Sequence, residues 1–145
     1  PASDYVRNFF DTVDTSRYLT ASQLMTDTVP LYGHNGETPD AAQICQDLQD
    51  QDQHYAFIVN ENNEFQGSTS LGKIALMVNG DAVQPLENDA LQQIEPLSHD
   101  MSLEQIIERV VDTNGPVPVV DEDGQYSGSI SKGNLLSRLQ GESNE

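Results

Sequence analysis

The stretches Gly67-Ser-Thr-Ser-Leu-Gly-Lys73 and Gly128-Ser-Ile-Ser-Lys-Gly-Asn134 are two versions of one sequence, and they decide how the chain folds. The residues before them also align without a gap, Tyr55–Gly67 on Pro116–Gly128, at a constant offset of 61 residues. A fixed internal period indicates one structural unit used twice, in which each copy is too small to bury its apolar face alone. We therefore expect a tandem repeat whose function lies between the copies.

Hydrophobic periodicity predicts the order β-α-β-β-α in each copy. For the first copy the expected elements are a strand over Val29–Tyr32, a helix over Ala41–Leu48, strands over Tyr55–Val59 and Phe65–Ser70, and a helix over Leu71–Val78. For the second copy they are a helix over Leu103–Val111, strands over Val117–Val120 and Tyr126–Ser131, and a helix over Leu135–Leu139. The fold class is therefore α+β, with two repeats packed through their sheets.

Turn and capping residues locate the ends of these elements. Thr38 is the expected N-cap of the helix that starts near Ala41, because Pro39 and Asp40 follow it. The expected divisions are a linker over residues 1–20, a first repeat over 21–79, a linker over 80–93, a second repeat over 94–140 and an acidic tail over 141–145. Since the chain starts at Pro1 without a methionine, we expect it to be a fragment of a longer protein.

The composition excludes several classes of partner. The net charge is −18, whereas nucleic acids and anionic membranes attract basic patches. The simplest interpretation of this acidity is a solvated surface, as in a salt-adapted organism. No stretch approaches the ~18 apolar residues of a membrane span, so direct membrane insertion is not expected. Cys45 is the single cysteine, and its place on a helical apolar face indicates a small buried side chain in a reducing cytosol.

Three motifs with chemical meaning are incomplete. Gly67–Lys73 nearly matches a phosphate-binding P-loop, but Ile74 stands where a hydroxyl must hold Mg²⁺. Asp121–Gly124 begins like a calcium loop, but Lys132 takes the place of the glutamate at the twelfth position, which favours a hairpin turn. The three histidines lack the spacing of metal ligands, and no nucleophile and base form a pair. We therefore predict no catalytic residues, no metal site and no enzymatic activity.

The hydroxyl groups of Ser70 and Ser131 allow two interpretations. Each follows a strand and precedes a helix, so each can cap that helix. The same hydroxyl, beside backbone N–H groups at the positive end of a helix, can also hold a phosphate or a ribose. The sequence leaves both interpretations open.

The tandem β-α-β-β-α pattern with the signature Gly-x-x-Ser-x-x-Asn134 resembles a pair of CBS domains, a Bateman module. The chain also resembles the C-terminal region of the ATP-binding subunit of glycine betaine/L-proline ABC transporters. This second resemblance rests on Pro1–Phe10, Val13-Asp14, Tyr55–Val59, Val117–Tyr126 and Ile130–Gly133, and it covers nearly the whole chain.

The resemblance implies a regulatory role in the uptake of compatible solutes under osmotic stress. The implied partners are an ATPase core upstream in the same chain, the membrane subunit of the transporter and a second copy in a homodimer. The implied location is the cytoplasm, at the inner face of the membrane. The alternative is a CBS module that senses an adenine nucleotide for another transporter or enzyme.

The resemblance also implies where a ligand would bind. Related CBS pairs bind adenine nucleotides between their copies, so AMP, ATP or cyclic di-AMP is the expected ligand, and no cofactor is required. The candidate ligand-binding residues are Ser131, Asn134, Pro118 and Ser70. The aspartate that accepts from ribose hydroxyls is absent from both copies. Asn134 retains an amide oxygen as acceptor, whereas Lys73 has none, which favours the second signature.

Overall fold

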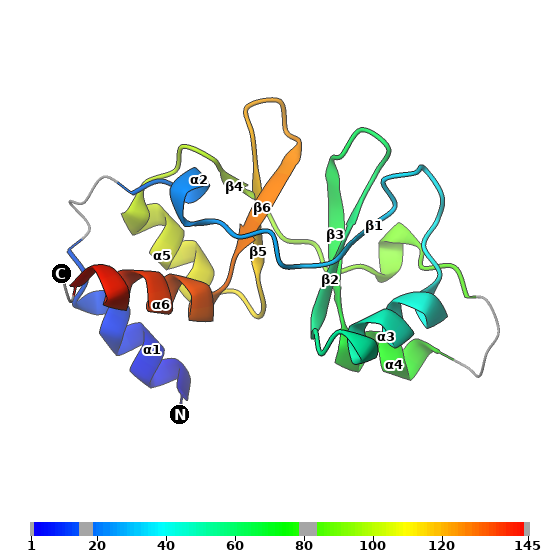
Figure 1. Cartoon of the computed structure of the whole chain (residues 1–145), viewed down its shortest axis with the longest axis horizontal. Coiled ribbons are helices and arrows are strands. Elements are labelled where there is room, and N and C mark those ends of the chain that lie inside the picture. The colour runs from blue at the N-terminus through cyan, green and yellow to red at the C-terminus, as the bar shows by residue number, and fades with distance from the viewer. Residues whose placement is uncertain (1, 15–18, 79–83, 144–145) are drawn as a thin grey trace. The chain divides into compact units, whose positions relative to one another are not determined.

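The computed structural model describes residues 2–14, 19–78 and 84–143, which form two compact units (Figure 1). Unit 1 comprises Pro1–Thr28, Pro96–Glu122 and Ser127–Glu145, and unit 2 comprises Val29–Glu95 and Asp123–Tyr126. Among the described residues, no helix has both the length and the apolar composition needed to cross a bilayer.

Unit 2 is built on a three-stranded sheet with two helices. Its strands are β1 (Leu31–Tyr32), β2 (Tyr55–Val59) and β3 (Phe65–Ser70), in the order β1-β2-β3. β1 is parallel to β2, and β2 is antiparallel to β3. The helices are α3 (Ala41–Asp50) and α4 (Leu71–Met77), followed by the short 3-10 helix η1 (Asn88–Ala90). This is the β-α-β-β-α order predicted for the first copy.

Unit 1 repeats this architecture and adds two helices. Its sheet has the order β4-β5-β6, with β4 (Leu97–Ser98), β5 (Val117–Val120) and β6 (Tyr126–Ile130), of which Tyr126 groups with unit 2. Helices α5 (Leu103–Val111) and α6 (Lys132–Ser143) complete the repeat, and α1 (Ala2–Asp11) and α2 (Ala21–Leu24) precede it. The predicted α+β class and the two-fold repetition are confirmed, while the packing of the two copies through their sheets stays a prediction.

The predicted apolar stripes form the cores. Ala41, Ile44, Cys45 and Leu48 of α3 are all buried, and so are Leu103, Ile106, Ile107 and Val110 of α5. The short helix α4 differs, because Ile74 is buried but Ala75 is exposed. On the sheet of unit 2, the ring of Phe57 makes edge contacts with Phe65 at 5.3 Å and with Tyr126 at 5.8 Å between ring centroids.

The predicted N-cap of α3 is wrong by two residues. Asp40, not Thr38, precedes the helix, and its carboxylate accepts a hydrogen bond from the backbone N–H of Ala42 at 3.2 Å. The same oxygen accepts from the N–H of Gln84 at 2.8 Å, a partner 44 residues away in the chain. The cap therefore also holds a distant segment, which local capping preferences cannot indicate.

A hydrogen bond between β1 and α3 perturbs a tyrosine. The hydroxyl of Tyr32 donates to the carboxylate of Asp47 at 2.8 Å. Burial, and then this hydrogen bond to a negative group, raise the pKa of Tyr32 above its ordinary value. The phenol therefore stays protonated and acts as a fixed link between strand and helix.

The segment before each copy's first strand joins the sheet of the other copy. Within unit 2, Gln92 pairs with Ser68 of β3 through two backbone hydrogen bonds of 3.0 and 2.8 Å. Within unit 1, Thr26 pairs with Ser129 of β6 through two backbone hydrogen bonds of 2.8 Å each. Ser68 and Ser129 are equivalent in the repeat, so both copies use the same position for this pairing.

The repeat bounds expected from the periodicity stay a prediction and differ from the bounds of the compact units.

These crossing segments explain the first glycine of each repeated stretch. A Cβ atom on Gly67 would lie 2.6 Å from the Cβ of Leu91, and one on Gly128 would lie 2.9 Å from the carbonyl oxygen of Thr26. Real Cβ atoms essentially never approach a heavy atom closer than 3.0 Å. Both glycines therefore permit a backbone approach that any side chain would block. Leu91 of the expected linker, which lies against Gly67, is buried, and so is Leu86 earlier in the same segment.

We expect Gly67→Ala and Gly128→Ala each to lower the free energy of unfolding by about 1–3 kcal/mol, the usual cost of overpacking a core. Gly72→Ala and Gly133→Ala are matched controls, because an added Cβ there meets nothing within 4 Å. Both control sites are helical, so alanine should be neutral or stabilise by up to about 1 kcal/mol. Urea unfolding of the four variants tests this, and equal effects at all four glycines would contradict it.

Candidate functional site

Ser131 and Asn134 lie together at the start of α6 in unit 1. The Oγ atom of Ser131 accepts a hydrogen bond from the backbone N–H of Asn134 at 3.1 Å. The same hydroxyl donates its hydrogen to the side-chain Oδ1 of Asn134. The two candidate residues therefore form a closed pair, in which the serine caps the helix and the asparagine orients the serine.

Ser70 has the equivalent place in unit 2. It is the N-cap of α4, and its Oγ atom accepts from the backbone N–H of Lys73 at 3.2 Å. The lysine side chain offers no acceptor, so the hydroxyl of Ser70 lacks the partner that Ser131 has in Asn134. The capping interpretation of the repeated signature is confirmed in both copies, and its role in ligand binding stays a prediction.

Pro118 lies within β5, the strand next to β6 in the sheet of unit 1, and it is buried. The structure thus brings three of the four candidate residues into unit 1. Ser131 is half-buried and Asn134 is exposed, so solvent reaches this pair more readily than it reaches the proline. Ser70 belongs to unit 2.

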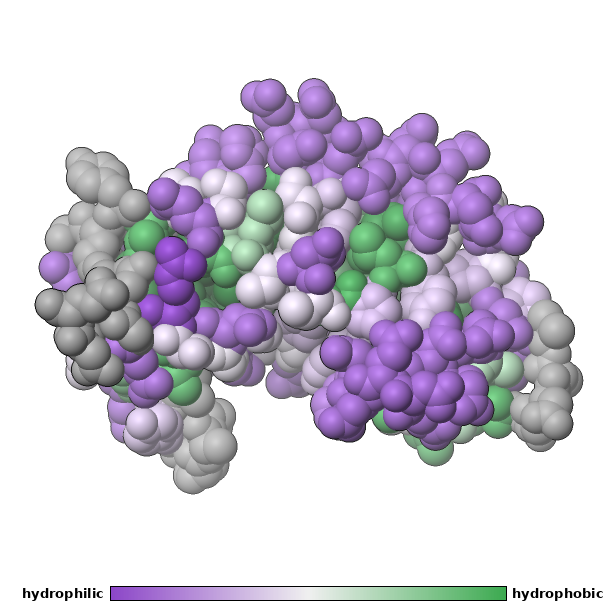
Figure 2. All heavy atoms as spheres, viewed as in Figure 1, coloured by the Kyte–Doolittle hydropathy of each residue, from purple (hydrophilic) through white to green (hydrophobic). Residues whose placement is uncertain are grey.

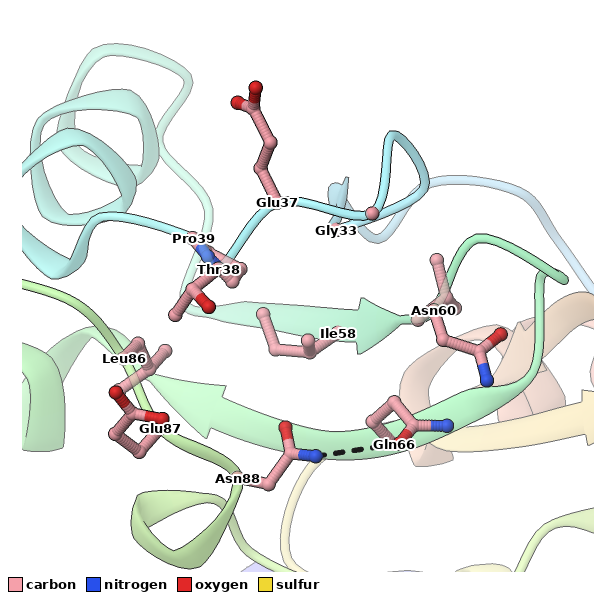
Figure 3. Close-up of a pocket in the computed structure, with 12 residues that line it drawn as sticks. Gly33, Glu37, Thr38, Pro39, Ile58, Asn60, Gln66, Leu86, Glu87 and Asn88 are labelled. Carbon is pink, nitrogen blue, oxygen red and sulfur yellow. Dashed lines mark hydrogen bonds between the residues drawn. The ribbon is translucent and has the colours of Figure 1, made fainter.

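Unit 2 also contains a hollow of about 220 Å³ that no sequence motif indicated (Figure 3). It is lined by the loop after β1, by the end of β2 and by the crossing segment that contains Leu86 and Asn88. Residues 33–40 separate β1 from α3, whereas only residues 99–102 separate β4 from α5. The longer loop belongs to the first copy alone, and in the structure Leu31 of β1 and Leu97 of β4 are therefore 66 residues apart rather than 61.

The loop over residues 33–40 packs closely against β2. Several polar side chains that line the hollow are hydrogen-bonded within the chain. Gly33 has a φ of +96°, and a Cβ there would lie 2.3 Å from the carbonyl oxygen of Val59. At the floor of the hollow, the side-chain amide of Asn88 donates a hydrogen bond to the side-chain oxygen of Gln66 at 3.5 Å, as Figure 3 shows. Oδ1 of Asn60 accepts from two backbone N–H groups of its own turn. Glu37 points away from the hollow in Figure 3. We therefore assign this hollow no ligand.

The surface is strongly hydrophilic, as the purple residues across the visible face in Figure 2 show. Among the described residues, no three of the histidine, cysteine, aspartate and glutamate side chains are grouped so as to hold a metal ion. Asp121–Gly124 leads into a turn, and Gly124 has a φ of +81°. What the candidate site offers chemically is hydrogen bonding at a helix start.

Comparison with known proteins supports the resemblance seen in the sequence. Residues 91–141 match the family model of the CBS domain. The chain is 35% identical, over 98% of its length, to the glycine betaine/proline betaine transport system ATP-binding protein ProV of Escherichia coli. It spans 35% of the length of that relative.

Two solved structures share the fold. A CBS domain pair/ACT domain protein from Thermotoga maritima gives a TM-score of 0.69 at 13% identity, with 86% of this chain and 98% of that chain covered. CbpB in complex with c-di-AMP gives a TM-score of 0.71 at 14% identity, with 95% and 93% covered. Residues 91–141 therefore belong to the CBS-domain family, and the chain as a whole has the fold of a CBS domain pair.

Proposed function

We propose that this chain is the regulatory module of the ATP-binding subunit of a glycine betaine importer, where it controls the uptake of compatible solutes. The observation that carries the proposal is the 35% identity to ProV over 98% of the chain. The proposed partners are an ATPase core in the same polypeptide, the membrane subunit of the transporter and a second copy of the module. The module would then work in the cytoplasm, at the inner face of the membrane, without catalysis of its own.

The charge of the chain supports ionic strength as the signal. At a net charge of −18, two modules repel each other across about 10 Å at 0.1 M salt. At about 1 M salt the screening length shrinks to about 3 Å, so close approach costs less free energy. Cytoplasmic ionic strength rises when a cell loses water. Association of two modules would then report osmotic stress without any small ligand.

A nucleotide is the second candidate signal, and the CbpB complex with c-di-AMP favours it. The hydrogen-bonded pair of Ser131 and Asn134 supports a specific mode of binding, in which a hydrogen bond within the pair is replaced by hydrogen bonds to the ligand. The Ser131 hydroxyl would turn its hydrogen from Asn134 to a ligand phosphate, while its lone pair continues to cap the helix. Oδ1 of Asn134 would then be free to accept from a ribose hydroxyl. Pro118 and Ser70 complete the proposed ligand-binding set.

For the ionic-strength mechanism, we expect the chain to form dimers that strengthen as KCl rises from about 0.05 to 0.6 M, a range over which screening changes severalfold. Sedimentation velocity measures the oligomeric state. Sucrose at matched osmolality is the control, because it lowers water activity without screening charge. An oligomeric state that stays constant, or a dimer that dissociates with salt, would contradict the mechanism.

For the nucleotide mechanism, calorimetric titration with AMP, ATP and cyclic di-AMP should give binding that Ser131→Ala combined with Asn134→Ala abolishes. Ser131→Ala also removes a helix cap, at a cost of about 1 kcal/mol in stability. Ser102→Ala removes the cap of α5, which lies outside the proposed ligand-binding set, and is the control for that loss. Binding that persists in the double variant would place the ligand elsewhere.

A further inference from the structure

Helices α1 and α5 of unit 1 enclose a groove of about 470 Å³ with an apolar floor and an acidic rim. Phe10 and Val13 line it from the side of α1, and Ile107 and Val111 from α5. Phe10 is 3% exposed and Ile107 is 9% exposed, so these two side chains anchor the floor. The groove is distinct from the Ser131–Asn134 pair.

Two acidic side chains of α5 and one at its C-cap follow the groove as a single stripe. Glu104, Glu108 and Asp112 are spaced four residues apart, which places them on one side of a helix. Asp11 adds a fourth carboxylate from α1. Glu104 lies in the first turn of α5, where a negative charge favours the helix, whereas the repulsion of like charges at this spacing costs a few tenths of a kcal/mol.

Within the described part of the chain, only one of the four carboxylates, that of Asp112, forms an ion pair. Arg7 of α1 binds Asp112 at 2.9 Å and closes one end of the groove. Glu104, Glu108 and Asp11 are exposed and have no hydrogen bond or ion pair with a described residue. The groove thus combines an apolar floor with three unbalanced negative charges.

A single helix from a second copy of this chain does not fit the charges of this groove. The whole sequence has six Lys and Arg residues, and no two of them lie within five residues of each other. No segment of it can therefore present two cations on one helical face to Glu104 and Glu108. Charge complementarity requires a basic partner.

We propose that the α1–α5 groove binds a basic amphipathic helix of another protein. The apolar side chains of that helix would pack on Val13, Ile107 and Val111, and its Lys or Arg residues would pair with Glu104 and Glu108. This is recognition of a helix in a groove, in which apolar anchors supply affinity and the charged rim supplies orientation.

The test uses a labelled synthetic peptide of leucine and lysine at helical spacing, about 14 residues or four turns long. Fluorescence anisotropy in 0.1 M KCl measures its Kd for the chain. We expect the double variant E104Q/E108Q to bind roughly tenfold more weakly, a change of about 1.4 kcal/mol. The matched control E61Q/E122Q removes the same net charge from exposed turns and should change the Kd by less than about twofold, within the weak effect of remote surface charges.

Equal losses in the two double variants would show general attraction to an acidic surface and overturn the proposal. Val111→Thr keeps the charge and nearly the shape, and should weaken binding by removing apolar contact. If Val111→Thr binds as tightly as the wild type, the proposed floor is wrong. NMR of the wild-type chain gives a readout that needs no variant. Peptide-induced shifts should centre on residues 7–13 and 104–112, and shifts centred elsewhere would also overturn the proposal.

Discussion

The close backbone approach at Gly67 and Gly128 is the constraint on which both units depend. At each glycine, a segment from before the other copy's first strand comes near enough to exchange two hydrogen bonds with the following serine. Without that approach, β3 and β6 would each lose a neighbouring segment, and Leu91 would lose its place in the core beside Gly67. Each copy therefore supplies a segment to the sheet of the other, as expected for copies too small to fold alone.

The repeated signature serves two purposes with the same atoms. Its glycine admits the crossing segment, and three residues later its serine caps the following helix, as Ser70 and Ser131 both do. A stable helix start presents ordered backbone N–H groups, which is also what an anionic ligand needs. One difference between the copies lies three residues after the cap, where one has Lys73 and the other Asn134. Under the proposed nucleotide binding, that difference would make the two signatures unequal as binding sites even though both serve as caps.

The acidic residues of this chain have two separate proposed roles. In the proposed mechanism, the net charge of −18 keeps copies apart at low salt and makes their association sensitive to ionic strength. The stripe of Glu104, Glu108 and Asp112 has a more local effect, because it borders apolar side chains rather than open solvent. A diffuse acidic surface governs association through screening, whereas an acidic rim on an apolar groove selects a partner by shape and sign.

The sequence by itself determined the β-α-β-β-α order, most strand bounds and the apolar stripes, because these depend on local periodicity and on a 61-residue repeat. Tyr55–Val59, Phe65–Ser70 and Val117–Val120 are strands with the predicted bounds. It also indicated that Ser70 and Ser131 stand at helix starts. Only the tertiary structure placed the cap of α3 at Asp40, since that carboxylate also holds Gln84, which is 44 residues away. Only the tertiary structure also assigned the crossing segments to their sheets and joined α1 to α5 around a groove. These features are contacts between residues far apart in the chain, and no local pattern of residues encodes which distant surface a segment will meet.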